Sequence, residues 1–140
     1  MLTNKVFIAV MLAVIVSQTT KIILSMIKDK RGFALKDIIV TGGMPSSHSA
    51  AVSSLFAILI LETGLSNWTI IAIVLFTIVV TDSMGVRRTA GEEAKAVNEI
   101  IKMERLKIHP LHYALGHKPI EVLAGIIIGF CVALGIWFLL

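Results

Sequence analysis

The chain has 140 residues, of which 56% are hydrophobic and 16% are charged, and its formal net charge is +4. Soluble domains are roughly half apolar and about a quarter charged, so this composition indicates a membrane protein and no nucleic-acid partner is expected. The one cysteine, Cys131, lies in an apolar run and predicts neither a disulfide nor a zinc cluster. We expect a single membrane-embedded domain over residues 1–140.

Four apolar runs predict membrane-spanning helices, since a helix needs about 20 residues to cross a bilayer. They cover residues 6–27, 49–61, 70–80 and 120–140. The first run could instead be a signal peptide, but no small-residue cleavage site is visible. The last run contains Gly125, Gly129 and Gly135, which are expected to form close-contact faces between helices.

A polar segment, residues 83–118, separates the third run from the fourth. Within it Ala90, Ala94, Val97 and Ile101 fall on one face of a helix expected over residues 89–105. This helix is expected to lie along the membrane surface, although a soluble amphipathic helix would show the same pattern. The predicted fold class is therefore all-α: a small polytopic membrane bundle of four transmembrane helices plus one amphipathic interfacial helix.

Polar residues at the ends of the four runs are expected to meet on one membrane face, because successive spans alternate in direction. Of the 13 Lys and Arg residues, only Lys5 falls on the opposite face, with the termini and the turn at residues 62–67. The positive-inside rule therefore predicts a multi-pass protein of the cell membrane, with the polar face in the cytoplasm and both termini outside.

The stretch before the second run, residues 42–49, combines two glycines, a proline, three serines and a histidine. Pro45 suits the first turn of a helix. Hydroxyl and free N–H groups of Ser46 and Ser47 at a helix start would attract an anion. His48 would supply a proton donor or acceptor beside that anion. An ordinary helix cap explains the same residues.

His117 and Glu121 open the fourth run and, four residues apart, share a helix face. The carboxylate can accept the imidazole N–H and leave the other ring nitrogen free to attack. Arginines and lysines on the same membrane face suit a phosphate group. These cations are Lys21, Lys28, Arg87 and Arg88. A basic cytoplasmic rim would explain most of the lysines, but not the two histidine motifs.

These motifs resemble those of the type 2 phosphatidic acid phosphatases, which are related to the vanadium-dependent haloperoxidases. The resemblance is closest to a small divergent branch of that superfamily and runs over nearly the whole chain. It rests on three segments: Gly-Gly-Met-Pro-Ser-Ser-His-Ser at residues 42–49, Asp-x-x-Gly-Val-Arg-Arg-x-Ala-Gly at residues 82–91, and Leu-Gly-His-x-Pro-x-Glu-Val at residues 115–122.

The chain departs from the superfamily motifs at several positions. In Pro-Ser-Gly-His, Ser47 takes the glycine position, and in Ser-Arg-x5-His-x3-Asp, Glu121 takes the aspartate position. Leu111 stands where the arginine six residues before His117 belongs, so Arg87 or Arg88 is expected to replace it across an inserted helix. Lys21 and Lys28 keep the spacing of Lys-x6-Arg-Pro, but lysine replaces its arginine and Asp29 its proline.

The resemblance implies a two-step phosphoryl transfer that needs no metal or cofactor. His117 would form a phosphohistidine, Glu121 would orient it, and His48 would protonate the leaving oxygen and then activate water. Adjacent positions on a helix point about 100° apart, so only one of Arg87 and Arg88 is expected to face the bundle. Asp82 would pair with the other arginine or with Lys21, and Gly43 would have a supporting role. The phosphate would be held by Lys21, Lys28, Arg87, Arg88, Ser46 and Ser47.

The implied substrate is a phospholipid or isoprenoid phosphate whose tails stay in the bilayer, and a homo-oligomer is compatible with four spans. A non-catalytic membrane protein that binds anionic lipid headgroups or phosphate is the alternative, because one motif is absent and another is split. Vanadate-dependent haloperoxidation is a weaker option, since those enzymes are large and soluble. His109 and His112 are three apart, but no carboxylate or thiol nearby completes a metal site.

Overall fold

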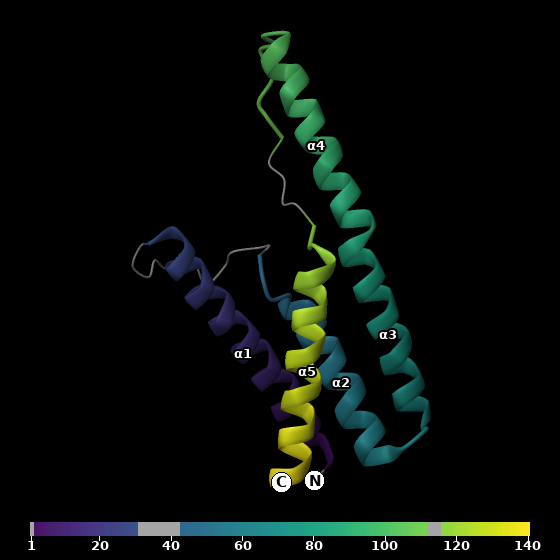
Figure 1. Cartoon of the computed structure of the whole chain (residues 1–140). Coiled ribbons are helices and arrows are strands. Elements are labelled where there is room, and N and C mark those ends of the chain that lie inside the picture. The colour runs from purple at the N-terminus through teal and green to yellow at the C-terminus, as the bar shows by residue number, and fades with distance from the viewer. Residues whose placement is uncertain (1, 31–42, 112–115) are drawn as a thin grey trace.

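The computed structural model describes residues 2–30, 43–111 and 116–140. Gly42, His112 and Leu115, which belong to segments noted above, lie outside the described residues. The described chain is helical, which confirms the all-α prediction. Its helices are α1 (Leu2–Asp29), α2 (Ser47–Thr63), α3 (Asn67–Met84), α4 (Val86–Met103) and α5 (Pro119–Leu139), as labelled in Figure 1.

Three stretches are long and apolar enough to cross a membrane: Lys5–Lys28, the combined α3–α4 stretch Asn67–Met103, and Pro119–Leu139. The remaining apolar helix, α2, has 17 residues and is shorter than a typical span. The protein is thus a small helical membrane protein with three long apolar candidate spans. A fourth span at α2 stays a prediction.

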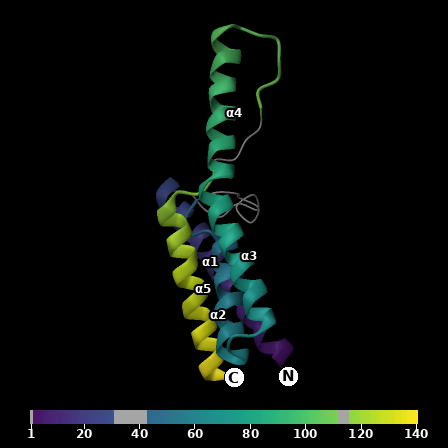
Figure 2. The ribbon, with the colours of Figure 1, turned by 90° about the vertical axis from the view of Figure 1, so that its right-hand side faces the viewer.

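Helix α2 lies at the centre of the bundle, where it packs against α1, α3 and α5, and α1 also packs against α5. Both termini lie at one end of the bundle in Figure 1, while α2 and α5 begin at the other end. The second view, Figure 2, shows the same arrangement from the side. The motif residues are therefore gathered at the end opposite the termini, as the alternation of span directions predicts.

Glycines in α5 allow a close approach to α2. A Cβ atom on Gly125 would overlap the backbone oxygen of Ser46, and one on Gly129 would overlap the Ser53 hydroxyl and the backbone oxygen of Ala50. Small residues permit such contacts between helices in lipid. The expectation is confirmed for these two glycines but is wrong for Gly135, where a Cβ would meet nothing within 4 Å.

Helix α4 begins at Val86, with only Gly85 between it and the end of α3, and projects past the end of the bundle in much the same direction as α3 (Figures 1 and 2). This orientation differs from the expected one along the membrane surface. The physical reason lies at Gly85, whose N–H donates to the Thr81 oxygen at 2.9 Å and whose oxygen accepts the Thr89 N–H at 3.0 Å. Helical hydrogen bonding thus continues on both sides of the junction.

Candidate functional site

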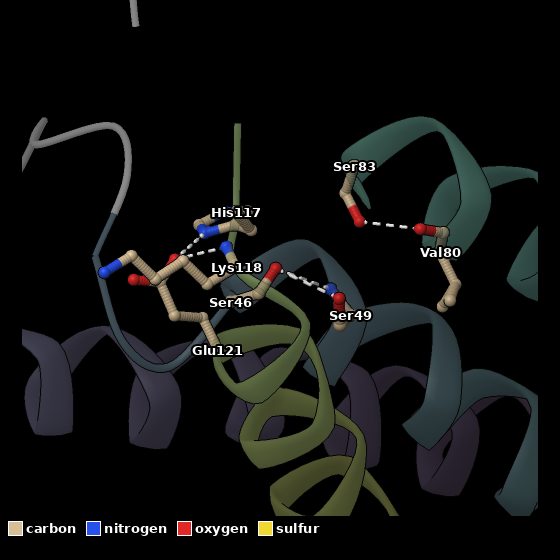
Figure 3. A network of polar contacts seen from close by, with 7 residues as sticks. All are labelled: Ser46, Ser49, Val80, Ser83, His117, Lys118 and Glu121. Carbon is tan, nitrogen blue, oxygen red and sulfur yellow. Dashed lines mark hydrogen bonds and ion pairs between the residues drawn. The ribbon is translucent and has the colours of Figure 1, made fainter. Parts of the chain in front are cut away.

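The start of α5 holds a histidine–carboxylate pair. Pro119 occupies the first helical position, which suits a residue without an N–H. Glu121 Oε2 accepts the backbone N–H of Lys118 at 3.1 Å and lies 3.0 Å from His117 Nδ1 (Figure 3). His117 precedes the helix instead of sharing its face, and the cap at Lys118 brings the two side chains together.

This pairing fixes the chemistry of the His117 ring. An ionised carboxylate only accepts hydrogen bonds, so Nδ1 carries the hydrogen that it shares with Glu121. In the neutral imidazole the lone pair then resides on Nε2. The negative carboxylate is also well placed in the first turn of α5, where the helix dipole favours it. The pairing with Glu121 therefore leaves Nε2 as the ring nitrogen that can interact with a ligand.

The backbone of His117 is held by α3. Its N–H donates to the backbone oxygen of Ser83 at 3.2 Å. Ser83 is buried, and its hydroxyl donates to the Val80 oxygen at 2.8 Å (Figure 3). The sequence analysis did not single out Ser83. Its place directly after Asp82, at the polar end of an apolar run, is the signal that could have suggested it.

The N-terminus of α2 is tied to α5 through Ser46. The Ser46 N–H donates to the backbone oxygen of Glu121 at 3.0 Å, and its hydroxyl accepts from the Ser49 hydroxyl at 3.0 Å and the Ser49 N–H at 3.4 Å. Ser46 is fully buried and caps α2. Its groups are therefore engaged, and the amides of Ser47 and His48, at the first two helical positions, are the ones without an intrahelical acceptor.

The segment before α2 also contains Pro45 and Gly43, for which the sequence predicted a helical first turn and a supporting role. Pro45 is buried and precedes the Ser46 cap, so it does not occupy the first turn of α2 as predicted. Gly43 is exposed and has φ +84°, a left-handed conformation that glycine adopts without strain. A Cβ there would meet nothing within 4 Å. Gly43 thus provides a turn of the backbone before α2.

Lys21 is buried in α1, with only 6% of its surface exposed. Its positive charge acts on both Glu121 and His48, which places it in electrostatic reach of both motifs. A lysine within a candidate span is costly unless it serves a polar site. Lys28 differs, since it is exposed in the last turn of α1, two turns beyond Lys21. The contacts of the described residues do not join Lys28 to either histidine.

His48 lies at the start of α2, outside the three candidate spans, and its pKa is affected by charged groups from three other segments. Partial burial is the main cause that lowers its pKa, and the positive charges of Arg87 and Lys21, together with that of the His117 ring when it is protonated, lower it further. These groups come from α4, from the segment before α5 and from α1. Four chain segments thus bring positive or titratable groups to one place, and such a place favours a bound anion.

The two arginines have different surroundings. Arg87 Nε lies 2.7 Å from Asp82 Oδ2, and Arg88 Nε lies 3.0 Å from Glu92 Oε1. The pKa of His48 is lowered by the charge of Arg87, whereas Arg88 is not among the causes of that shift. Asp82 was expected to pair with the arginine that faces away or with Lys21. That expectation is wrong, because Asp82 pairs with the arginine that acts on His48.

The sequence model of the Divergent PAP2 family matches residues 2–132 of this chain. The chain belongs to the Divergent PAP2 family. It is also 33% identical over 151 aligned residues to a protein of Bacillus subtilis (strain 168) named "Uncharacterized membrane protein YuiD". That alignment covers 96% of this chain and 94% of the relative. No solved structure matches the chain. The resemblance inferred from the three motifs is thereby confirmed.

In this Divergent PAP2 protein, the segment between the arginines and His117 folds back on itself. Gly116 contacts the backbone of Arg88, and the side chain of Asn98 binds the backbone of Leu111. The expected helix does intervene between Arg88 and His117. Neither Gly116 nor Asn98 was singled out beforehand. Gly116 directly precedes the histidine of its motif, and that position is the signal that could have suggested it.

In residues 2–30, 43–111 and 116–140, no group of three or more His, Cys, Asp or Glu side chains is arranged to hold a metal ion. His109 is exposed in the segment that follows α4. The described residues bring two imidazoles, a carboxylate and a cluster of cations to this end of the bundle.

Proposed function

We propose that this Divergent PAP2 protein hydrolyses a phosphomonoester or pyrophosphate carried by a membrane lipid, through a phosphohistidine formed on His117. The observation that carries the proposal is the 3.0 Å contact between His117 Nδ1 and Glu121 Oε2. It leaves Nε2 with the lone pair, in a cluster whose positive charges converge on His48. A nucleophile oriented by a carboxylate beside a second acid–base group is the arrangement that covalent phosphoryl transfer needs.

In the first step, the lone pair of His117 Nε2 attacks phosphorus while the bond from phosphorus to the leaving oxygen breaks. Protonated His48 gives its proton to that oxygen, so the lipid leaves as an alcohol or as a phosphate. Glu121 balances the positive charge that develops on the His117 ring. The negative phosphate raises the proton affinity of His48, which opposes the lowering of its pKa by the surrounding cations.

In the second step, neutral His48 accepts a proton from water as the water oxygen attacks phosphorus. The bond between phosphorus and His117 Nε2 breaks, and inorganic phosphate is released. His117 regains its lone pair and His48 its proton, so the enzyme returns to its starting state. One histidine thus acts as nucleophile and the other as acid and then base, which divides a slow hydrolysis into two easier displacements.

The phosphate oxygens would be bound by Lys21, Arg87 and the amides of Ser47 and His48. Buried Lys21 supplies charge from α1, and the two amides lie at the positive end of the α2 dipole. The pair with Asp82 uses Nε of Arg87, so the terminal amino groups can bind phosphate oxygens. Ser46 holds α2 against α5 instead of binding the ligand directly.

The membrane setting supports a lipid substrate. The site lies at one end of a bundle of apolar helices, where a lipid headgroup can enter while its tails stay between the spans. Helix α2, with 17 residues, is about 26 Å long at 1.5 Å per residue, close to the roughly 30 Å hydrocarbon core. We therefore include the apolar part of α2, residues 49–61, as a fourth span, which leaves His48 and the site on the cytoplasmic side and both termini outside.

A second candidate is a non-catalytic protein that binds anionic lipid headgroups. One observation favours it: each guanidinium group is already paired with a carboxylate, Arg87 with Asp82 and Arg88 with Glu92. Lys28 is also exposed, and none of the described contacts joins it to either histidine. A cluster of this kind can bind a headgroup by charge alone, without the full set of hydrogen-bond donors that would stabilise a transition state.

Phosphate release separates the two candidates. Purified protein in detergent micelles is incubated with a panel of phosphatidic acid, lysophosphatidic acid and isoprenoid mono- and diphosphates, and free phosphate is measured. The phosphatase proposal predicts turnover of at least one lipid and its loss in His117→Ala. Binding to vesicles that contain phosphatidic acid, without release of phosphate from any member of the panel, would contradict it and support the second candidate.

A further inference from the structure

Gly116 lies directly against the backbone at the start of α4. A Cβ atom built on it would stand 2.5 Å from the Arg88 nitrogen, 2.6 Å from the Arg88 Cα and 2.9 Å from the Arg87 carbonyl carbon. Real Cβ atoms essentially never approach so closely, and helix backbone cannot rotate away as a flexible side chain can. Any other residue at position 116 must push the two segments apart.

His117, the next residue, is fixed on two further sides. Its N–H donates to the buried Ser83 at the end of α3, and its ring contacts Glu121 at the start of α5. Its position relative to α4, however, depends on the contact at Gly116, one peptide bond away. A shift at Gly116 would therefore be transmitted to the His117 backbone with little loss.

A second contact holds the returning chain farther from the site. Asn98, on α4, accepts the Leu111 N–H at 2.7 Å through Oδ1 and donates to the Leu111 oxygen at 2.8 Å through Nδ2. Both backbone hydrogen-bonding groups of Leu111 are thus bound by one side chain, thirteen residues away. Two contacts thus join the chain that follows α4 to α4 itself. Gly116 packs against the start of the helix, and Leu111 binds Asn98 farther along it.

We infer that Gly116 is a positioning residue, which docks the segment carrying His117 onto the start of α4 and so brings His117 and Arg87 into one site. The inference rests on the proposed function, because it explains how the two halves of a split phosphate site are joined. Arg87 belongs to the α3–α4 stretch, and its side chain pairs with Asp82 of the same stretch. His117 precedes α5, and its side chain pairs with Glu121 of that helix. The joint between them is made by backbone, and glycine is what permits it.

The test compares Gly116→Ala with Gly135→Ala, which adds the same methyl group where nothing lies within 4 Å. We expect Gly116→Ala to lower kcat about 100-fold with little change in KM, since misplacement of a reacting group by about 1 Å has an effect of that size. Gly135→Ala should retain the wild-type kcat and KM. Helix content and thermal unfolding of each purified variant show whether the bundle is intact.

A spectroscopic measurement makes the inference independent of activity. The groups that face His48 are Lys21 from α1, Arg87 from α4 and His117 before α5, and all three lower its pKa. If the His117 segment moves off α4 in Gly116→Ala, the pKa of His48, followed by NMR of the labelled ring, should rise toward its ordinary value. Gly135→Ala should leave it at the wild-type value.

Asn98→Ala provides a variant that does not disturb a packed interface, because this contact is exposed, and Glu99→Ala is its matched control on the same helix. Asn98→Ala should shift the His48 titration in the same direction as Gly116→Ala, by less, while Glu99→Ala should not. A folded Gly116→Ala protein with the wild-type His48 titration would overturn the inference. If the wild-type protein released no phosphate, the proposed function would fail, and the titration would still decide the docking role of Gly116.

Discussion

The two ends of the bundle both carry charged side chains at the edge of apolar helices, but they use those charges differently. At the end with the termini, Lys5 Nζ pairs with Glu62 Oε1 at 3.3 Å, and the Thr69 hydroxyl donates to the Gly64 oxygen at 2.7 Å. At the other end, Lys21, Arg87 and His117 all act on His48 with the same sign.

This difference separates a structural role from a functional one. At the end with the termini, the charges of Lys5 and Glu62 balance each other and so attract a ligand only weakly. A group of cations that face one histidine is unfavourable by itself, and a bound anion relieves the repulsion. The comparison therefore predicts that substitutions at the motif end change catalysis, whereas substitutions at the end with the termini change only stability.

After the loss of the nucleophile itself, the largest effect is expected for the acid–base residue. His48→Ala should lower kcat by about 10²–10⁴-fold, the contribution typical of general acid–base catalysis. The loss should be smaller for substrates whose leaving group is more acidic, because they need less proton donation. Steady-state kinetics with a series of aryl phosphates would show this. An equal loss for every leaving group would contradict the role of His48.

A smaller effect is expected from exchanging the arginines for lysine, which keeps the charge but loses the bidentate fork. Arg87→Lys should lower kcat/KM about 10-fold or more, since one good charge-assisted hydrogen bond contributes about 1.5–3 kcal/mol. Arg88→Lys, whose partner is Glu92, is the matched control and should stay near the wild-type value. Equal losses at both sites, or a loss at Arg88 alone, would contradict the distinction between them.

The helix runs and the pairing of His117 with Glu121 could be predicted because both depend on short-range patterns along the chain. The choice between Arg87 and Arg88 could not, since it depends on how α4 is placed relative to Gly116 and His48. The bond from the Ser46 N–H to the Glu121 oxygen joins two helices distant in sequence, and so removes a donor that the motif seemed to offer. The direction of α4 depends on the backbone at Gly85, which the amphipathic pattern does not contain.

The pH dependence of the free energy of unfolding should reflect the cations around His48. The pKa of His48 lies below its ordinary value of about 6.5, so protonation opposes the folded state. The unfolded chain binds this proton more readily, and the free energy of unfolding should fall as pH is lowered through that ordinary value. Lys21→Met and Arg87→Gln should each raise the pKa of His48 in an NMR titration. A pKa that stays unchanged in both variants would contradict the shared cluster.

The smallest effect is expected at the other end of the bundle. Lys5→Met and Glu62→Gln each break the ion pair, whose partners are partly exposed. Such pairs contribute about 1 kcal/mol or less, so the free energy of unfolding should fall by no more than that. Neither kcat nor KM should change. A loss of activity comparable to that of Arg87→Lys would remove the contrast between the two ends.

Trapping of the phosphoenzyme tests the central claim most directly. Protein is mixed with a lipid substrate labelled at its phosphate, quenched rapidly in base, which preserves phosphohistidine, and analysed by mass spectrometry of its peptides. The account predicts a base-stable, acid-labile phosphate on His117, absent from His117→Ala and still formed, more slowly, in His48→Ala. Turnover of the lipid with no phosphate on His117, or with phosphate on another residue, would contradict it.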